Sequence, residues 1–108
     1  MKAVFSEAFV QSLKKHSSIK ESIRKKTDLI MLDPVAFGEP LKGRFRGYNS
    51  CPVKRNFLII YLYCRSCRAK CDDKTVLCHD CLKCTDDTVK FVDLGPHDET
   101  YTKKSRWK

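Results

Sequence analysis

Apolar residues recur at helical spacing near the start of the chain. Phe5, Phe9 and Leu13 are each four positions apart, which places them on one face of a helix. Ser6 precedes this run and is a favourable N-cap residue, so we expect a helix from there to about residue 16. The residues before it, 2–5, are short and apolar enough to form a strand.

A second helix is predicted from residue 18 to the residues before Pro34. Ser18 and Glu21 have the spacing of a capping box, in which the two side chains satisfy each other's backbone amides. Ile23 and Ile30 lie on one side of this helix, and Pro34 ends it because the residue before a proline avoids helical geometry. The short link between the helices favours an antiparallel helical hairpin.

Strand patterns replace helical ones after a glycine- and proline-rich loop over residues 35–48. Residues 49–55 form a strand with a kink at Pro52, which cannot donate to a ladder. Residues 56–63 are apolar on both faces and therefore predict a central strand.

The last predicted strand, residues 87–95, alternates in polarity. Strict alternation puts Val89, Phe91 and Asp93 on one face and the residues between them on the other. This strand and residues 56–63 flank a cysteine-rich block and are natural hairpin partners. We therefore predict one α/β domain of the α+β type over residues 1–108. Two N-terminal helices pack on a small antiparallel sheet, and residues 64–84 are inserted at a hairpin tip.

Net charge is strongly positive and unevenly spread. The chain has 22 Lys and Arg against 13 Asp and Glu, a formal +9, and residues 1–60 carry +7 of it (12 basic, 5 acidic). Such an excess favours polyanionic partners such as RNA, DNA, the ribosome or an acidic protein. No apolar run approaches the roughly 20 residues of a membrane span, and no signal-peptide core is present. We expect a cytoplasmic protein without a membrane partner, whose thiols stay reduced.

Six of the seven cysteines lie within the inserted block. Cys64 and Cys67 form one Cys-x-x-Cys pair and Cys78 and Cys81 another, the arrangement that closes a tetrahedral zinc site. Replacing Cys78 by Cys84 gives an alternative ligand set that the spacing also allows. Cys71 and Cys84 are otherwise spare thiols, and Cys51 is expected to be a small buried hydrophobe.

A four-sulfur zinc site has no open coordination position, so its expected role is structural. The block holds too few apolar residues to fold around a core of its own, and metal binding would supply that free energy. An alternative is a zinc ribbon that contacts nucleic acid through Arg65, Arg68 and Lys70.

The segments "LKGRFRGYNSCPVKRNFLIIY" and "TVKFVDLGPHDETY" resemble the RelE/YafQ toxins of prokaryotic type II toxin–antitoxin systems. Relative to the best-known members, the cysteine block is an insertion. The resemblance implies an antiparallel sheet packed by two N-terminal helices, ribosome-dependent mRNA cleavage, and neutralisation by an antitoxin. His97 matches the C-terminal catalytic histidine of the YafQ-like pattern, and Tyr101 matches a functional aromatic.

The remaining site candidates are basic. Cleavage by the 2′-hydroxyl of the RNA itself needs proton transfer, for which His97 is placed, and cations around the phosphorane. Arg55 is the third catalytic candidate because its planar fork suits phosphate, while Lys54, Arg44 and Arg46 are candidates for RNA binding.

Three positions depart from the family pattern. Pro52, Asn56 and Leu58 stand where the family has polar or charged groups. Two alternatives follow: a non-catalytic RNA- or ribosome-binding relative, and a gyrase-directed toxin like those of the ParE branch.

Overall fold

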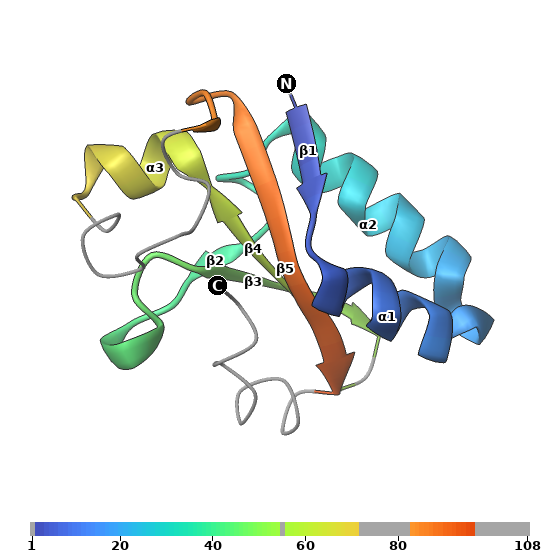
Figure 1. The fold of residues 1–108 in the computed structure, drawn as a ribbon. Helices are drawn as coiled ribbons and strands as arrows, with labels where there is room; N and C mark the ends of the chain where they lie inside the picture. Colours follow the sequence, from blue (N-terminus) through green and yellow to red (C-terminus); the bar gives the residue numbers. More distant parts are fainter. Residues whose placement is uncertain (1, 55, 72–82, 97–108) are drawn as a thin grey trace.

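A five-stranded sheet organises the computed structural model, which describes residues 2–54, 56–71 and 83–96. The strand order is β1-β5-β4-β3-β2 (Figure 1). Strand β1 (Lys2–Phe5) runs parallel to β5 (Thr88–Pro96), and every other neighbouring pair is antiparallel. The α+β class is therefore confirmed, although the sheet is mixed because the first strand joins the last one in parallel.

Helix α1 (Glu7–Lys15) follows β1 directly, as predicted. The side chain of Ser6 caps it, accepting a hydrogen bond of 3.1 Å from the amide of Phe9. The Ser6 hydroxyl also donates to the carbonyl of Val92 at 2.7 Å. One short side chain thus stabilises the helix start and fixes it to β5.

Helix α2 (Lys20–Leu32) begins later than the capping-box pattern indicated. Ser18 lies inside a short 3₁₀ turn, η1 (Ser17–Ile19), and the N-cap of α2 is Ile19, which makes no side-chain cap hydrogen bond. The capping-box prediction was therefore wrong, because the linker between the helices is itself helical. The end before Pro34 is as expected, and Asp33 is the C-cap residue.

The central position of the apolar strand is confirmed. Strand β4 (Phe57–Tyr63) lies between β3 (Asn49–Lys54) and β5, and short β2 (Glu39–Pro40) forms the edge. The register between β3 and β4 shifts after Pro52, where a kink was predicted. Asn56 has φ 65°, a left-handed conformation that asparagine tolerates in a tight turn.

Strand β5 does not alternate strictly. A register shift opposite residues 60 and 61 makes Phe91 pair with Tyr61 but Asp93 pair with Ile60. This β-bulge moves the side chains after Phe91 to the opposite faces. The prediction that Asp93 shares a face with Phe91 was wrong: Leu94 packs with Phe91, and Asp93 lies opposite them.

Two hydrophobic clusters cover the two faces of the sheet. The first lies under α1 and α2, where Phe9, Ile23 and Ile30 pack against Ile59 and Phe91 (Figure 1). The second cluster lies on the other face and contains Tyr48, Leu58, Ile60, Leu62, Cys64, Cys67 and Val92. Because β4 contributes to both clusters, it is apolar on both faces, which explains its unbroken run of hydrophobic residues.

The cysteine block begins with a helix, α3 (Cys64–Ala69), directly after β4. Since Tyr63 pairs with Val89, the block lies at the end of the β4–β5 hairpin, as predicted. The first Cys-x-x-Cys pair is thus part of a helical turn. None of the helices in the described parts of the chain has the length and apolar character that a membrane crossing requires.

Candidate functional site

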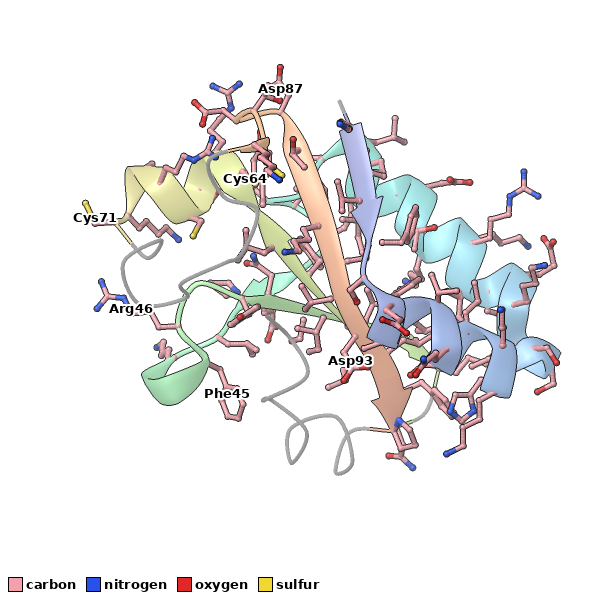
Figure 2. All side chains as sticks on the ribbon, viewed as in Figure 1. Phe45, Arg46, Cys64, Cys71, Asp87 and Asp93 are labelled. Atoms are coloured by element: carbon pink, nitrogen blue, oxygen red, sulfur yellow. The ribbon has the colours of Figure 1, made fainter. Side chains whose placement is uncertain are left out.

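A pocket of about 470 Å³ opens between α3 and the chain segment that precedes β3. Its wall combines two regions that are distant in sequence. The first supplies Pro40, Leu41, Lys42, Gly43, Arg46, Gly47, Tyr48 and Asn49, and the second supplies Ser66, Cys67 and Lys70. Arg46 lies below α3 in Figure 2, on the side of the molecule away from α1 and α2.

The first wall is shaped by glycines and by an apolar anchor. Gly43 and Gly47 have φ of 65° and 99°, so the chain bends twice within a few residues around the short helix η2 (Gly43–Phe45). Leu41 donates its backbone N–H to the carbonyl of Tyr48 at 2.9 Å, which closes the loop. Tyr48 is buried in the second cluster and holds the loop against the sheet.

The pocket is basic. Lys42, Arg46 and Lys70 are exposed on its rim, and the described lining residues include no aspartate or glutamate. No ion pair joins Lys42 or Lys70 to another residue in the described ranges. Lys42 and Lys70 line one hollow from its two sides and repel each other, so this arrangement favours an anionic ligand.

The sequence candidates meet this pocket only in part. Arg46 lines it, whereas Lys54 is exposed at the far end of β3. His97, Tyr101 and Arg55, together with the side chain of Arg44, lie outside the described residues. Lys42 was not singled out from the sequence, because in a chain of 22 basic residues nothing local distinguishes it.

The two described members of the predicted zinc set lie close together. Cys64 and Cys67 are one helical turn apart on α3 and both are buried in the second cluster. Spacing of i, i+3 places both sulfurs on one face, as a metal site needs. Cys84, the alternative ligand, packs against the same cluster. Cys78 and Cys81 lie outside the described residues.

No complete metal site is visible in the described ranges. There, no group of three or more potential metal ligands comes together, and no disulfide joins two of the cysteines. Cys51 is buried in the first cluster, as predicted, and burial raises the pKa of its thiol. A protonated thiol under the helices is a poor metal ligand.

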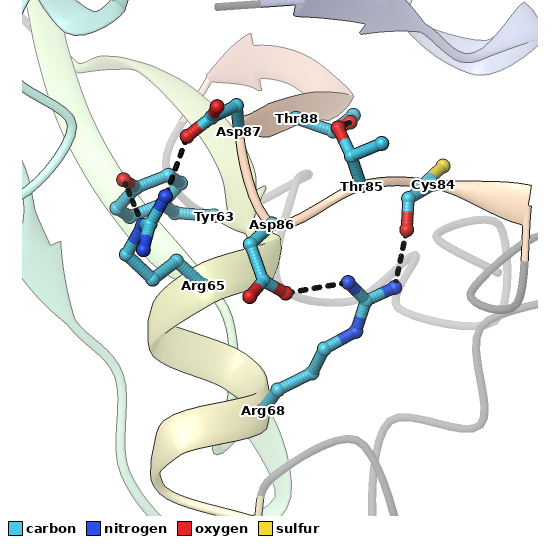
Figure 3. A network of polar contacts seen from close by, with 8 residues as sticks. All are labelled: Tyr63, Arg65, Arg68, Cys84, Thr85, Asp86, Asp87 and Thr88. Atoms are coloured by element: carbon cyan, nitrogen blue, oxygen red, sulfur yellow. Dashed lines mark hydrogen bonds and ion pairs between the residues drawn. The ribbon is translucent and has the colours of Figure 1, made fainter.

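Two arginines tie α3 to the start of β5 (Figure 3). Arg65 pairs with Asp87 at 2.6 Å, and its Nε donates to the hydroxyl of Tyr63 at 3.2 Å. Arg68 pairs with Asp86 at 2.7 Å and donates to the carbonyl of Cys84 at 2.6 Å.

These two arginines are among the three cations considered for direct nucleic-acid contact, which stays a prediction; in the structure both form ion pairs with aspartates just before β5. Lys70, the third, lines the pocket.

Comparisons with known proteins give limited information. No family model matches the chain, and no curated protein matches it. The chain is similar to the solution structure of the conserved hypothetical protein HP0894 from Helicobacter pylori, with 19% identity and a TM-score of 0.49. That similarity covers 91% of this chain and 96% of the other. At this level it carries no argument about function.

Proposed function

We propose that this protein is a toxin of the RelE/YafQ kind that cleaves mRNA on the ribosome and is neutralised by an antitoxin. The sequence resemblance suggests the activity, and the fold has the architecture which that resemblance implies: two N-terminal helices on one face of a small sheet. The observation that carries the proposal is that three cations of the segment 42–54 are exposed: Lys42 and Arg46 in the loop before β3, and Lys54 at the end of β3.

The proposed reaction needs no metal. His97 takes the proton of the RNA 2′-hydroxyl, the resulting oxygen attacks the adjacent phosphorus, and the bond to the 5′-oxygen breaks. Tyr101 protonates the departing 5′-oxygen, and Arg55 stabilises the charge of the phosphorane. The RNA backbone is bound by Lys54, Arg44 and Arg46. Each phosphate that they neutralise releases counterions, and this release favours binding.

The zinc ion has a separate, structural part in this proposal. Cys64, Cys67, Cys78 and Cys81 hold it, with Cys84 as the alternative to Cys78. The metal fixes the inserted block at the end of the β4–β5 hairpin and takes no part in cleavage.

A ribosome assay tests the activity. Purified protein is added to a translating extract, and transcript ends are mapped for wild type, His97→Ala and Tyr101→Phe. Wild type is expected to cut transcripts, His97→Ala to lose cleavage, and Tyr101→Phe to retain RNA binding while cleaving more slowly. Cleavage by His97→Ala at the wild-type rate refutes the catalytic assignment.

A non-catalytic RNA-binding protein is the second candidate, and the departures from the family pattern favour it. Leu58 is 9% exposed and belongs to the second cluster, and Asn56 occupies the left-handed turn position. Both positions therefore serve the fold. Growth inhibition with intact transcripts would support this candidate, and inhibition of supercoiling would support the gyrase-directed alternative.

A further inference from the structure

We propose that the pocket between α3 and the segment 40–49 binds a phosphate group of a single RNA strand together with its attached sugar. That the strand is RNA, and not another polyanion, rests on the proposed function. The site itself is defined by the described residues, and one side of its wall, made by Ser66, Cys67 and Lys70, comes from the inserted helix and its C-cap.

The charge of the wall favours an anionic ligand. Lys42 and Arg46 come from one side and Lys70 from the other, and the lining residues in the described part of the chain offer no carboxylate. An anion placed between the two sides removes the mutual repulsion of the cations. Lysines on one outer face would be ordinary solvated surface, but Lys42 and Lys70, which pair with no carboxylate in the described ranges, line a shared hollow from two elements.

The uncharged donors fit phosphate better than carboxylate. Ser66 and Asn49 are half-buried, line the same pocket and carry uncharged hydrogen-bond donors. Gly43 and Gly47 have no side chain to keep a ligand from their backbone. A phosphodiester presents oxygens in tetrahedral directions and can accept from several sides, whereas a carboxylate accepts in one plane.

The size of the pocket indicates more than an isolated ion. Small-molecule sites have volumes of about 300–1,000 Å³, and 470 Å³ lies within that range. The bare phosphate group would leave most of this space to water. A phosphate with its attached sugar occupies more of this volume than the phosphate alone.

The inserted helix is held firmly enough to serve as a wall. Cys64 and Cys67 bury one side of α3, and Arg68 fastens it to Asp86 and to the carbonyl of Cys84. Lys70 follows directly as the C-cap residue, so its backbone position is set by the helix. Such preorganisation reduces the entropy lost when the ligand binds.

Binding of a short fluorescent single-stranded RNA to the full chain tests the site without ribosomes. At about 0.1 M salt each lost phosphate contact should weaken binding roughly fivefold, and the slope of log K against log salt should fall by about 0.7. We expect this for Lys42→Ala and for Lys70→Ala. Lys25→Ala is the matched control, since Lys25 is exposed on α2 across the sheet, and its affinity should stay within about twofold of wild type.

Amide NMR spectra locate the contact independently of affinity. Uridine 5′-monophosphate should shift the amides of Gly43, Gly47 and Ser66, and inorganic phosphate should shift them less. Shifts elsewhere, or equal loss of RNA affinity in Lys25→Ala, would overturn the site. If Lys42→Ala and Lys70→Ala weaken the binding of polyglutamate as much as they weaken the binding of RNA, the choice of RNA is overturned. Because neither measurement involves cleavage, an inactive protein in the ribosome assay leaves these results intact.

Discussion

Arg68 and Arg65 provide a matched test of how α3 is fastened. Both lie on the same short helix, three residues apart, and each pairs with an aspartate of the segment leading into β5. Their surroundings differ. The side chain of Arg68 is 28% exposed and that of Arg65 is 56% exposed. Only Arg68 also donates to a backbone carbonyl, that of Cys84.

These differences set the expected energies. Substitution by methionine keeps the length and helix propensity of each side chain but removes its donors. For Arg68→Met the ion pair with half-exposed Asp86 contributes less than about 1 kcal/mol, and the charged hydrogen bond to the part-buried carbonyl contributes about 1.5 kcal/mol. The total of about 2 kcal/mol corresponds to roughly 8 °C in Tm for a domain of this size. Arg65→Met should lower Tm less than Arg68→Met, because its pair with Asp87 is solvated and screened and the only other contact it loses is the 3.2 Å hydrogen bond to the Tyr63 hydroxyl.

Thermal and urea unfolding followed by circular dichroism measure both variants, with zinc present throughout. A double-mutant cycle with Asp86→Asn separates the ion pair from the carbonyl hydrogen bond. Equal destabilisation by the two substitutions, or a larger effect at Arg65, would refute the assignment of Arg68 as the fastening residue.

Three further predictions concern the metal and the core. One zinc per chain is expected by elemental analysis; Cys64→Ser should lose it, whereas Cys51→Ser should retain it because Cys51 lies in the other cluster. Gly38→Ala should destabilise the fold by about 1–3 kcal/mol in urea, since its Cβ would lie 2.7 Å from Cζ of Tyr61, and a wild-type midpoint would contradict this packing. Burial raises the pKa of the Tyr61 phenol above 10.0. The protonated Tyr61 phenol therefore contributes fully to stability below about pH 10, and this contribution is lost as the pH rises further. The urea midpoint of the wild type should fall between neutral pH and about pH 11, and that of Tyr61→Phe should fall less. If the two proteins show the same dependence on pH, Tyr61 does not cause the loss of stability.

Features set by local pattern could be predicted from the sequence. Ser6 caps α1 because a short hydroxyl side chain directly before an amphipathic run has few competing conformations. Strand β4 is central because a run that is apolar on both faces can be buried only between two layers. The pairing of β4 with β5 followed from their positions on either side of the cysteine block.

Features set by tertiary contacts could not be predicted. The parallel pairing of β1 with β5 joins the first and the last strand of the sequence, and nothing in the four residues of β1 encodes its partner. The bulge in β5 places Asp93 opposite its predicted face, since alternation is a rule of the regular strand only. The Cys64–Cys67 spacing fits a metal knuckle and a helical turn equally well, because an offset of three positions is typical of both.

Helix α3 connects the two candidate sites of the molecule. Cys67 is 4% exposed in the second cluster and also lines the basic pocket, so one residue belongs to both the predicted zinc set and the predicted phosphate site. Ser66 and Lys70 lie on the same helical turn and its cap, so a shift of the α3 backbone that repositions Cys67 also repositions this wall of the pocket. If the cysteines bind zinc as proposed, the metal would therefore hold the backbone of that wall in place. Under both proposals the inserted block would contribute to the nucleic-acid surface while its metal stays outside the reaction.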